Sequence, residues 1–283
     1  MLAECGLFFG EIFMIQDLYP HVYHNEYHPH EPDQNDFVLF YDETMLYCKS
    51  YDRFFTVKEA GEQDLTYLFS IDDRSYYLGL QIPENGYAVS SAGIRTMAAA
   101  ENRFAAITGR QLACWYHDHR FCGVCGHTMR HHPVERALEC THCGKIVYPT
   151  IMPAVIVGVL NEKDQLLVTQ YAGRNQNHYA LVAGFAEIGE TIEETVRREV
   201  KEETGLDVSD ITYFKCQPWS FSDTLLFGFW CKADSSQPVV PDEQELKLAK
   251  WTDREELECP DDSISLTSHM IRMYCKGEKH YGS

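Results

Sequence analysis

The sequence predicts an α+β protein made of three successive sections. Residues 1–118 combine short β-rich runs with predicted helices, and residues 119–148 hold two closely spaced pairs of cysteines. Residues 149–283 add further β-rich runs and one strongly patterned helix with clear capping signals. Because 283 residues exceed one typical domain, we expect an N-terminal α+β domain, a small cysteine-rich domain and a C-terminal domain with these bounds.

The N-terminal section predicts four strands followed by two helices. Ser90 or Ser91 is expected to cap a helix that runs through Phe104 and stops near Gly109, and a second helix is expected over residues 111–117. We find no catalytic motif in this section. The β-rich runs cover residues 36–41, 44–49, 67–71 and 76–82.

The middle section contains two CxxC pairs, with residues 126–139 between them. This spacing is typical of a zinc ribbon, in which each pair presents two thiolates to one tetrahedral ion. Four ordinary buried cysteines and a redox CxxC are the alternatives, but two matched pairs favour metal. Nearby histidines could compete as ligands, although four thiolates already fill a closed structural site. We therefore predict one structural Zn²⁺ per chain, held by Cys122, Cys125, Cys140 and Cys143.

The strongest motif runs from Gly184 to Leu206 and reads GFAEIGETIEETVRREVKEETGL. It meets every fixed position of the pattern G-x5-E-x7-R-E-U-x-E-E-x-G-U, in which U is apolar. Thr191 and Glu194 form a capping box, which predicts a helix starting next to them. Gly205 is the expected C-terminal stop of this helix.

Three acids of this helix share one face, because Glu199, Glu202 and Glu203 are spaced i, i+3 and i+4. That face borders the apolar stripe of the helix, where unpaired carboxylates are costly to desolvate. A charge-rich surface helix is the simpler interpretation, but it does not explain acids beside a core-facing stripe. Mg²⁺ or Mn²⁺ suits such an all-oxygen site and often bridges carboxylates to substrate phosphates.

This stretch resembles the box of the Nudix hydrolases, which cleave nucleoside diphosphates linked to another moiety. The resemblance implies an α/β/α sandwich for the C-terminal domain, with the box as a loop-helix-loop. It implies Glu199, Glu202 and Glu203 as ligands of the catalytic Mg²⁺ or Mn²⁺, with Glu203 as our choice for the general base. Arg198 is expected to orient Glu202 by an ion pair, and Gly184 to allow a tight turn of the loop.

The order of the sections resembles the NADH pyrophosphatase branch of that family, with specific similarity from about Trp115 onward. A branch motif, SQPWPFPxS, is matched in part by residues 216–224, where Ser220 and Ser222 replace two prolines. The branch resemblance also implies that Glu245 lies beside the catalytic cations as a further ligand. The substrate contacts that it implies are Phe185, Tyr148, Glu135, Gln217, Trp219 and Glu245.

The branch resemblance implies hydrolysis of NADH or NAD⁺ to AMP and nicotinamide mononucleotide, and in some members removal of an NAD cap from RNA 5′ ends. It also implies a homodimer. One alternative is a Nudix hydrolase for ADP-ribose, coenzyme A or dinucleoside polyphosphates, which the two replaced prolines favour. The other is a binding module that uses the ribbon and has an inactive Nudix domain.

Composition limits the remaining possibilities. The formal charge of −19 argues against a long nucleic-acid footprint, although a cap needs only a few contacts. No apolar run is long enough to predict a membrane span, and the first residues make a poor signal peptide. We therefore expect a reducing, cytoplasmic location. The cysteines expected to be simple thiols are Cys5, Cys48, Cys114, Cys216, Cys231, Cys259 and Cys275.

Overall fold

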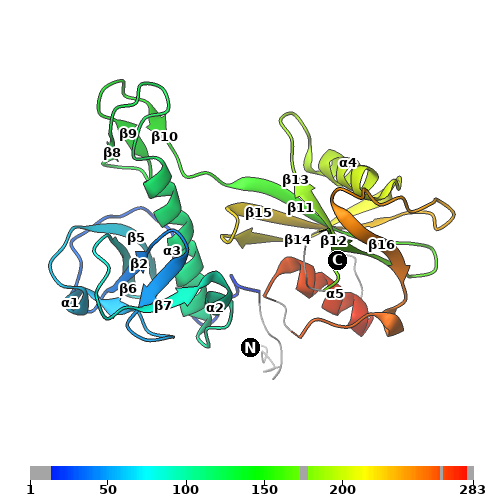
Figure 1. Cartoon of the computed structure of the whole chain (residues 1–283), viewed down its shortest axis with the longest axis horizontal. Helices are drawn as coiled ribbons and strands as arrows, with labels where there is room; N and C mark the ends of the chain where they lie inside the picture. Colours follow the sequence, from blue (N-terminus) through cyan, green and yellow to red (C-terminus); the bar gives the residue numbers. More distant parts are fainter. Residues whose placement is uncertain (1–13, 173–177, 262–263, 279–283) are drawn as a thin grey trace, which may run out of the picture. The chain divides into compact units, whose positions relative to one another are not determined.

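A computed structural model describes residues 14–172, 178–261 and 264–278 of the chain (Figure 1). The chain divides into two compact units. One unit comprises Ile15–Ile151 with Ser220–Asp223, and the other comprises Met14 with the described residues of 152–219 and 224–278. The predicted ribbon therefore lies in the same unit as the N-terminal section, and its treatment as a separate domain stays a prediction.

The first unit contains a seven-stranded mixed sheet with the order β1-β5-β6-β2-β3-β7, in which β4 pairs with β2. The parallel pair is β2 with β6, and the other pairs are antiparallel. The four predicted strands correspond to β2, β3, β5 and β6. The strands are β1 (Tyr23–His24), β2 (Phe37–Tyr41), β3 (Met45–Cys48), β4 (Phe55–Thr56), β5 (Leu65–Ile71), β6 (Arg74–Gly79) and β7 (Tyr87–Ser90), with the short helix α1 (Val57–Ala60) after β4.

Two helices follow this sheet, α2 (Ser91–Arg95) and α3 (Ala100–Asp118). Ser90 caps α2 as predicted, because its hydroxyl accepts a hydrogen bond from the Gly93 amide. The predicted single helix through Phe104 was wrong, because α2 ends at Arg95 and α3 begins at Ala100. The predicted stop near Gly109 was also wrong, since α3 continues through it and includes the expected second helix. A β-carbon at Gly109 would lie 2.5 Å from Cδ1 of Leu39 and 2.7 Å from Oη of Tyr41, so the glycine lets α3 pack closely on the sheet.

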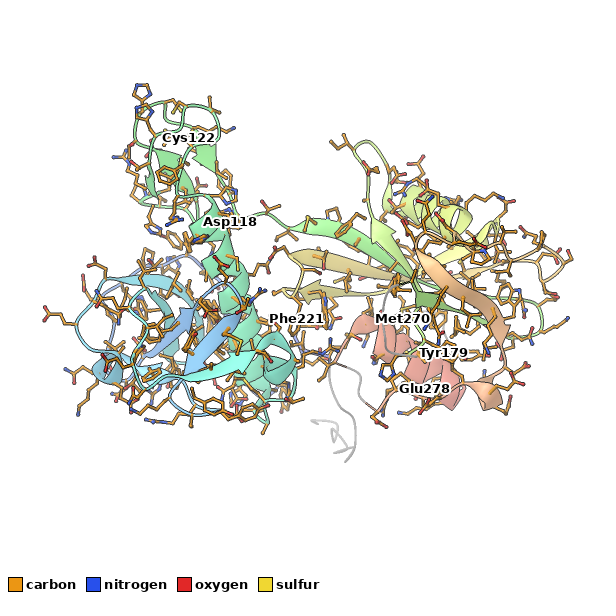
Figure 2. The ribbon with its side chains drawn as sticks, in the orientation of Figure 1. Asp118, Cys122, Tyr179, Phe221, Met270 and Glu278 are labelled. Atoms are coloured by element: carbon orange, nitrogen blue, oxygen red, sulfur yellow. A yellow bond between two sulfur atoms is a disulfide. The ribbon has the colours of Figure 1, made fainter. Side chains whose placement is uncertain are left out.

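A three-stranded antiparallel sheet, of order β10-β9-β8, follows α3. Its strands are β8 (Met129–His131), β9 (Leu138–Cys140) and β10 (Ile146–Val147). Cys122 comes shortly after Asp118, at which α3 ends (Figure 2). Arg136 fixes this small sheet to the rest of its unit by donating to the backbone carbonyls of Leu68 and, at 3.2 Å, Asn25.

The second unit is an α/β/α sandwich, as expected. Its six-stranded sheet has the order β14-β15-β11-β12-β16. The sixth strand, β13, pairs with residues 154–157 of β11. The long central strand β11 is parallel to β15. The elements are β11 (Met152–Leu160), β12 (Leu166–Tyr171), β13 (Val182–Phe185), α4 (Ile192–Thr204), β14 (Ser209–Trp219), β15 (Thr224–Lys232), β16 (Leu246–Thr252), the 3₁₀ helix η1 (Arg254–Glu256) and α5 (Leu266–Lys276).

The side chains of β11 alternate between two hydrophobic cores, as the period of two in a strand requires. Val155 and Val157 pack with Val200 of α4 on one face of the sheet. Ile156 packs on the other face with Met270, which lies on α5 (Figure 2). The sheet is thus covered by α4 and α5 on opposite faces.

The cysteine predictions need one correction. Cys259 and Cys275 form a disulfide that joins the segment after η1 to α5, so the expectation of two simple thiols was wrong. Cys48, Cys114, Cys216 and Cys231 are free thiols, whereas Cys5 lies outside the described residues. Within the described part of the chain, no helix has the length and apolar character that crossing a membrane requires.

Candidate active site

The helix α4 is held at both ends by the signals that the sequence predicts. Oγ1 of Thr191 accepts a hydrogen bond from the Glu194 amide at 3.2 Å, and the Glu194 carboxylate accepts one from the Thr191 amide at 2.7 Å. Gly205 ends the helix in the left-handed region, with φ of 75°. The capping box and the C-terminal stop are therefore confirmed. Val196 and Val200 are fully buried and fix which face of α4 meets the sheet.

The three acids of α4 differ in their burial. Glu203 is only 2% exposed and Glu199 is 9% exposed, whereas the side chain of Glu202 is 60% exposed. Oε1 of Glu203 accepts a hydrogen bond from the Ala183 amide of β13 at 3.3 Å. Its Oε2 is buried and has no hydrogen-bond partner among the described residues. Two of the acids are therefore desolvated beside β13, and the third stands at the edge of the site.

The pKa of Glu203 is raised to about 8, chiefly by burial and with smaller contributions from the negative charges of Glu199 and Glu245, while the hydrogen bond from the Ala183 amide opposes the shift. Burial also raises the pKa of Glu199, although Arg198 opposes this shift. Two neighbouring carboxylates whose pKa values are raised by burial are unfavourable as anions without a compensating cation. The unpartnered oxygen of Glu203 and the all-oxygen donor set therefore fit a hard divalent cation.

Arg198 connects the acids of the site. Its Nε and Nη2 donate to the two carboxylate oxygens of Glu190 at 2.6 and 2.9 Å, in a bidentate pair. Its Nη1 donates to Glu199 at 2.7 Å and to Glu202 at 2.9 Å, and Nη2 also donates to the carbonyl of Phe185 at 2.9 Å. One guanidinium thus holds two predicted cation ligands and the loop before α4.

Glu190 is a site residue to which the sequence assigns no role. The hydrogen bonds from Arg198 lower the pKa of Glu190 to about 2, with a further contribution from the Glu187 amide. Glu190 also accepts a hydrogen bond from the hydroxyl of Thr195 at 3.0 Å. Its fixed place in the motif was the available signal, but the partner eight residues along the chain becomes visible only in the fold.

Gly184 has a different role from the predicted one. It lies inside β13, opposite Val155, and not in a tight turn. A β-carbon at this position would lie 2.0 Å from Cδ of Glu199 and 2.1 Å from both carboxylate oxygens. The expectation of a tight turn was therefore wrong: the glycine is needed because a buried carboxylate passes directly over the backbone.

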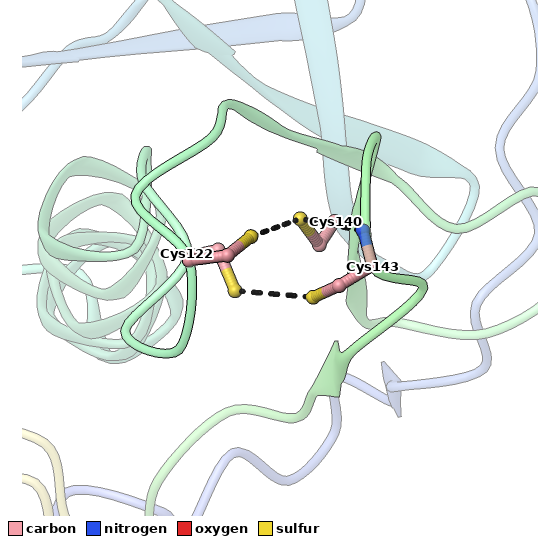
Figure 3. A group of neighbouring side chains, drawn as sticks. Cys122, Cys140 and Cys143 are labelled. Atoms are coloured by element: carbon pink, nitrogen blue, oxygen red, sulfur yellow. Dashed lines mark hydrogen bonds between the residues drawn. The ribbon is translucent and has the colours of Figure 1, made fainter.

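The four ribbon cysteines converge as the spacing predicts (Figure 3). The sulfur atoms of Cys122 and Cys143 are 3.7 Å apart, those of Cys125 and Cys140 are 3.4 Å apart, and all four lie within 4.8 Å of one another. The distances approach the sulfur–sulfur separation of about 3.8 Å that tetrahedral zinc requires. Backbone amides that donate to Cys140 lower its pKa to about 6, which favours the thiolate form that binds metal.

Comparison with known proteins agrees with both sites. Residues 150–272 match the model of the NUDIX domain, and residues 117–148 match that of the NADH pyrophosphatase zinc ribbon domain. The chain carries a Nudix domain. An NADH pyrophosphatase zinc ribbon precedes it, and the convergent cysteines support a structural zinc ion.

Two curated proteins resemble about half of this chain. The NAD-capped RNA hydrolase NudC of Salmonella agona and that of Salmonella typhimurium are each 41% identical to this chain over 143 residues. Each match covers 50% of this chain and 55% of the relative, so it spans about half the relative's length. A solved NUDIX hydrolase from Nitrosomonas europaea is 20% identical, with a TM-score of 0.48, and the match covers 58% of this chain and 96% of that one.

Three further predicted substrate residues of the Nudix domain lie at strand ends or just before a strand. Phe185 ends β13 and is half exposed, next to the carbonyl that Arg198 binds. Trp219 ends β14 and is partly buried. Glu245 is exposed just before β16, and its charge acts on both Glu199 and Glu203. The structure thus brings Glu245 to the acid cluster, while its role as a ligand stays a prediction.

Gln217 is fully buried within the Nudix domain. Its Nε2 donates to the carbonyl of Ile264 at 2.8 Å, and its Oε1 accepts from the amide of Leu266 at 2.6 Å. Both ends of the amide therefore hold the start of α5 against β14. The predicted contact of Gln217 with substrate remains untested, but the described side chain already has a structural role.

Tyr148 and Glu135 lie in the other unit, beside the ribbon. The hydroxyl of Tyr148 donates to the Glu135 carboxylate at 2.9 Å, and both side chains are exposed. The sequence predicts two separate contacts, whereas the structure joins them in one polar pair. The hydrogen bond also raises the pKa of Tyr148, because it favours the neutral phenol.

Proposed function

We propose that this chain is a divalent-cation-dependent hydrolase that cleaves the diphosphate of NADH or NAD⁺ to AMP and nicotinamide mononucleotide. The carrying observation is the pair of buried carboxylates, Glu199 and Glu203, one with an unpartnered oxygen, on the box helix of a Nudix domain. The preceding NADH pyrophosphatase zinc ribbon directs the proposal to a nicotinamide dinucleotide.

The acids Glu199, Glu202, Glu203 and Glu245 would hold the catalytic Mg²⁺ or Mn²⁺. When bound, such a cation supplies charge stabilisation for the diphosphate and activates water. Arg198 keeps Glu199 and Glu202 in fixed positions through its two shared hydrogen bonds. Pre-organised acids require little rearrangement when substrate binds, which favours the reaction.

Glu203 is our candidate for the general base. Its Oε2 is the carboxylate oxygen that has no hydrogen-bond partner among the described residues, so it can accept a proton from water. A pKa raised by burial also brings its proton exchange close to neutral pH, where a general base works best. Its bond to the Ala183 amide holds the other oxygen in place.

The exposed aromatic ring of Phe185 supports a stacking role toward a flat base or nicotinamide ring, since it lies close to the acid cluster. We propose further contacts from Trp219 and Gln217, and from the polar pair of Tyr148 and Glu135. A homodimer, a cytoplasmic location and a structural Zn²⁺ on the four cysteines complete the proposal.

The names of the Salmonella relatives support an extension of the same reaction to NAD-capped RNA. The cleaved bond would be the same diphosphate, so the acid cluster needs no change. The formal net charge of −19 disfavours binding of a long RNA, so we propose contacts only with the capped 5′ end.

A second candidate is hydrolysis of another nucleoside diphosphate derivative, such as ADP-ribose. Ser220 and Ser222 stand where the branch motif has prolines, and this difference favours a changed substrate preference. A panel containing NADH, NAD⁺, NAD-capped RNA, ADP-ribose and coenzyme A, assayed with Mg²⁺ or Mn²⁺, separates the candidates. The proposal requires higher kcat/KM for a nicotinamide substrate than for ADP-ribose; the reverse order supports the second candidate.

A further inference from the structure

A second group of metal-binding side chains lies beside the zinc cysteines. One ring nitrogen of His127, one of His142 and the sulfur of Cys125 all lie within 4.8 Å of one another. The two imidazole rings are stacked, with centroids 4.1 Å apart and an interplanar angle of 9°. Both histidines are exposed, and neither belongs to the four-thiolate set.

The ring of His127 is oriented by its own backbone. Its Nδ1 lies 3.1 Å from the carbonyl oxygen of Cys125. Because a carbonyl can only accept, Nδ1 must be the donor, and the neutral ring then carries its lone pair on Nε2. Metal-binding histidines commonly have this arrangement, in which one ring nitrogen donates to a carbonyl and the other binds the ion.

The donor set selects a particular class of ion. Imidazole and thiolate together suit Zn²⁺ and similar borderline ions and do not suit Mg²⁺. Tetrahedral zinc needs donor atoms about 3.3–3.8 Å apart, given Zn–N of about 2.0 Å and Zn–S of about 2.3 Å. The ligand atoms lie within 4.8 Å of one another, but the lone pairs of an imidazole lie in its ring plane, so the two stacked rings must turn out of their parallel arrangement to bind one ion. Both rings are exposed, which leaves room for this rotation.

Electrostatics favours a cation at this position. Four thiolates around one Zn²⁺ carry a net charge of −2, which attracts another cation to the same corner of the ribbon. A thiolate sulfur has further lone pairs, so Cys125 can contact a second ion while it remains a ligand of the first. Three protein donors leave the fourth position of the second ion for water or an anion.

We propose that His127, His142 and Cys125 form a second, weaker zinc site that shares the Cys125 thiolate with the structural zinc site. The exposure of both rings makes this ion exchangeable, unlike the ion held by four thiolates. The proposal does not depend on the diphosphate-cleaving activity.

Native mass spectrometry of the full chain in excess Zn²⁺ tests the proposal, with Mg²⁺ added to occupy the acid cluster. The wild-type chain should bind one more zinc ion than the double variant His127→Ala/His142→Ala. The matched control is His117→Gln, which replaces an exposed histidine outside the group and should bind as many ions as the wild type.

Cobalt titration provides the second readout. A second equivalent of Co²⁺ should change the absorption spectrum of the wild type, and this change should be missing in the double variant. Circular dichroism checks that both variants remain folded. Equal numbers of bound ions in the wild type and the double variant would overturn the proposal. Equal numbers would also be found if the histidines act only as alternative ligands of the structural zinc ion, and that outcome likewise excludes a second site.

Discussion

The Glu199 carboxylate lies against the backbone of Gly184, in the space that a β-carbon at position 184 would occupy. Their atoms come from different elements, β13 and α4, and their contact brings the box helix close to the sheet edge. Because Gly184 has no side chain, Glu199 can occupy this position, and Glu199 is one of the acids that we propose as ligands of the catalytic cation.

Gly184→Ala should displace Glu199, because the added methyl group would lie 2.0 Å from its Cδ. We expect activity to fall by about 100-fold, as is typical when a catalytic group moves by roughly 1 Å. Gly123→Ala is the matched control, since a β-carbon there meets nothing within 4 Å. Steady-state kinetics of both variants test this, and full activity of Gly184→Ala would show that the close approach is dispensable.

The pair formed by Glu190 and Arg198 predicts a pH dependence of stability. The folded-state pKa of Glu190, about 2, lies below its ordinary value of 4.5, so its stabilising effect is complete above pH 4.5. That effect is lost as the pH falls from 4.5 towards 2. Thermal unfolding across this range should therefore show a shallower loss of Tm for Glu190→Gln than for the wild type. Parallel Tm profiles would mean that the pair does not stabilise the fold.

Gln217→Ala should reduce the stability of the Nudix domain. It would remove the two buried hydrogen bonds that Gln217 makes with the Ile264 carbonyl and the Leu266 amide. We expect a loss of about 1–3 kcal/mol in the free energy of unfolding, measured with urea. Unchanged stability with a raised KM would instead identify Gln217 as a substrate contact without a structural role.

Removal of the structural zinc should destabilise the ribbon. Cys140→Ser takes away one of the four convergent thiolates, so the variant should hold zinc weakly and unfold at a lower temperature. Cys216→Ser, at an exposed cysteine away from the cluster, is the control and should keep both zinc and Tm. Bound zinc is measured by elemental analysis beside each melt. An unaltered Tm in a zinc-free Cys140→Ser chain would contradict the structural role.

Features set by neighbours in the chain could be predicted from the sequence. The capping box of Thr191, the stop at Gly205 and the convergence of the cysteine pairs all depend on short spacings, and the structure contains each of them. The acid spacing on α4 likewise follows from helix geometry. These local signals were enough to indicate the fold class and the acid cluster.

Features set by distant packing could not be predicted in this way. Gly109 reads as a helix stop, but close packing on Leu39 of β2 explains its place inside α3. The burial of Gln217 depends on residues 264 and 266, and the disulfide depends on how η1 approaches α5. Each of these features depends on a contact between residues far apart in the chain, and no sequence motif indicates that they meet.

The central claim is that Glu203 on a Nudix helix supports cleavage of a nicotinamide dinucleotide, and product analysis tests it most directly. NADH is incubated with Mg²⁺ or Mn²⁺ and the wild type, Glu203→Gln, or the exposed control Glu193→Gln of the same helix. Chromatography should show AMP and the mononucleotide from the wild type and the control. Glu203→Gln should be folded and slower by about 10²–10⁴-fold, as expected for loss of a general base. Wild-type turnover by Glu203→Gln, or no AMP from the wild type, would contradict the claim.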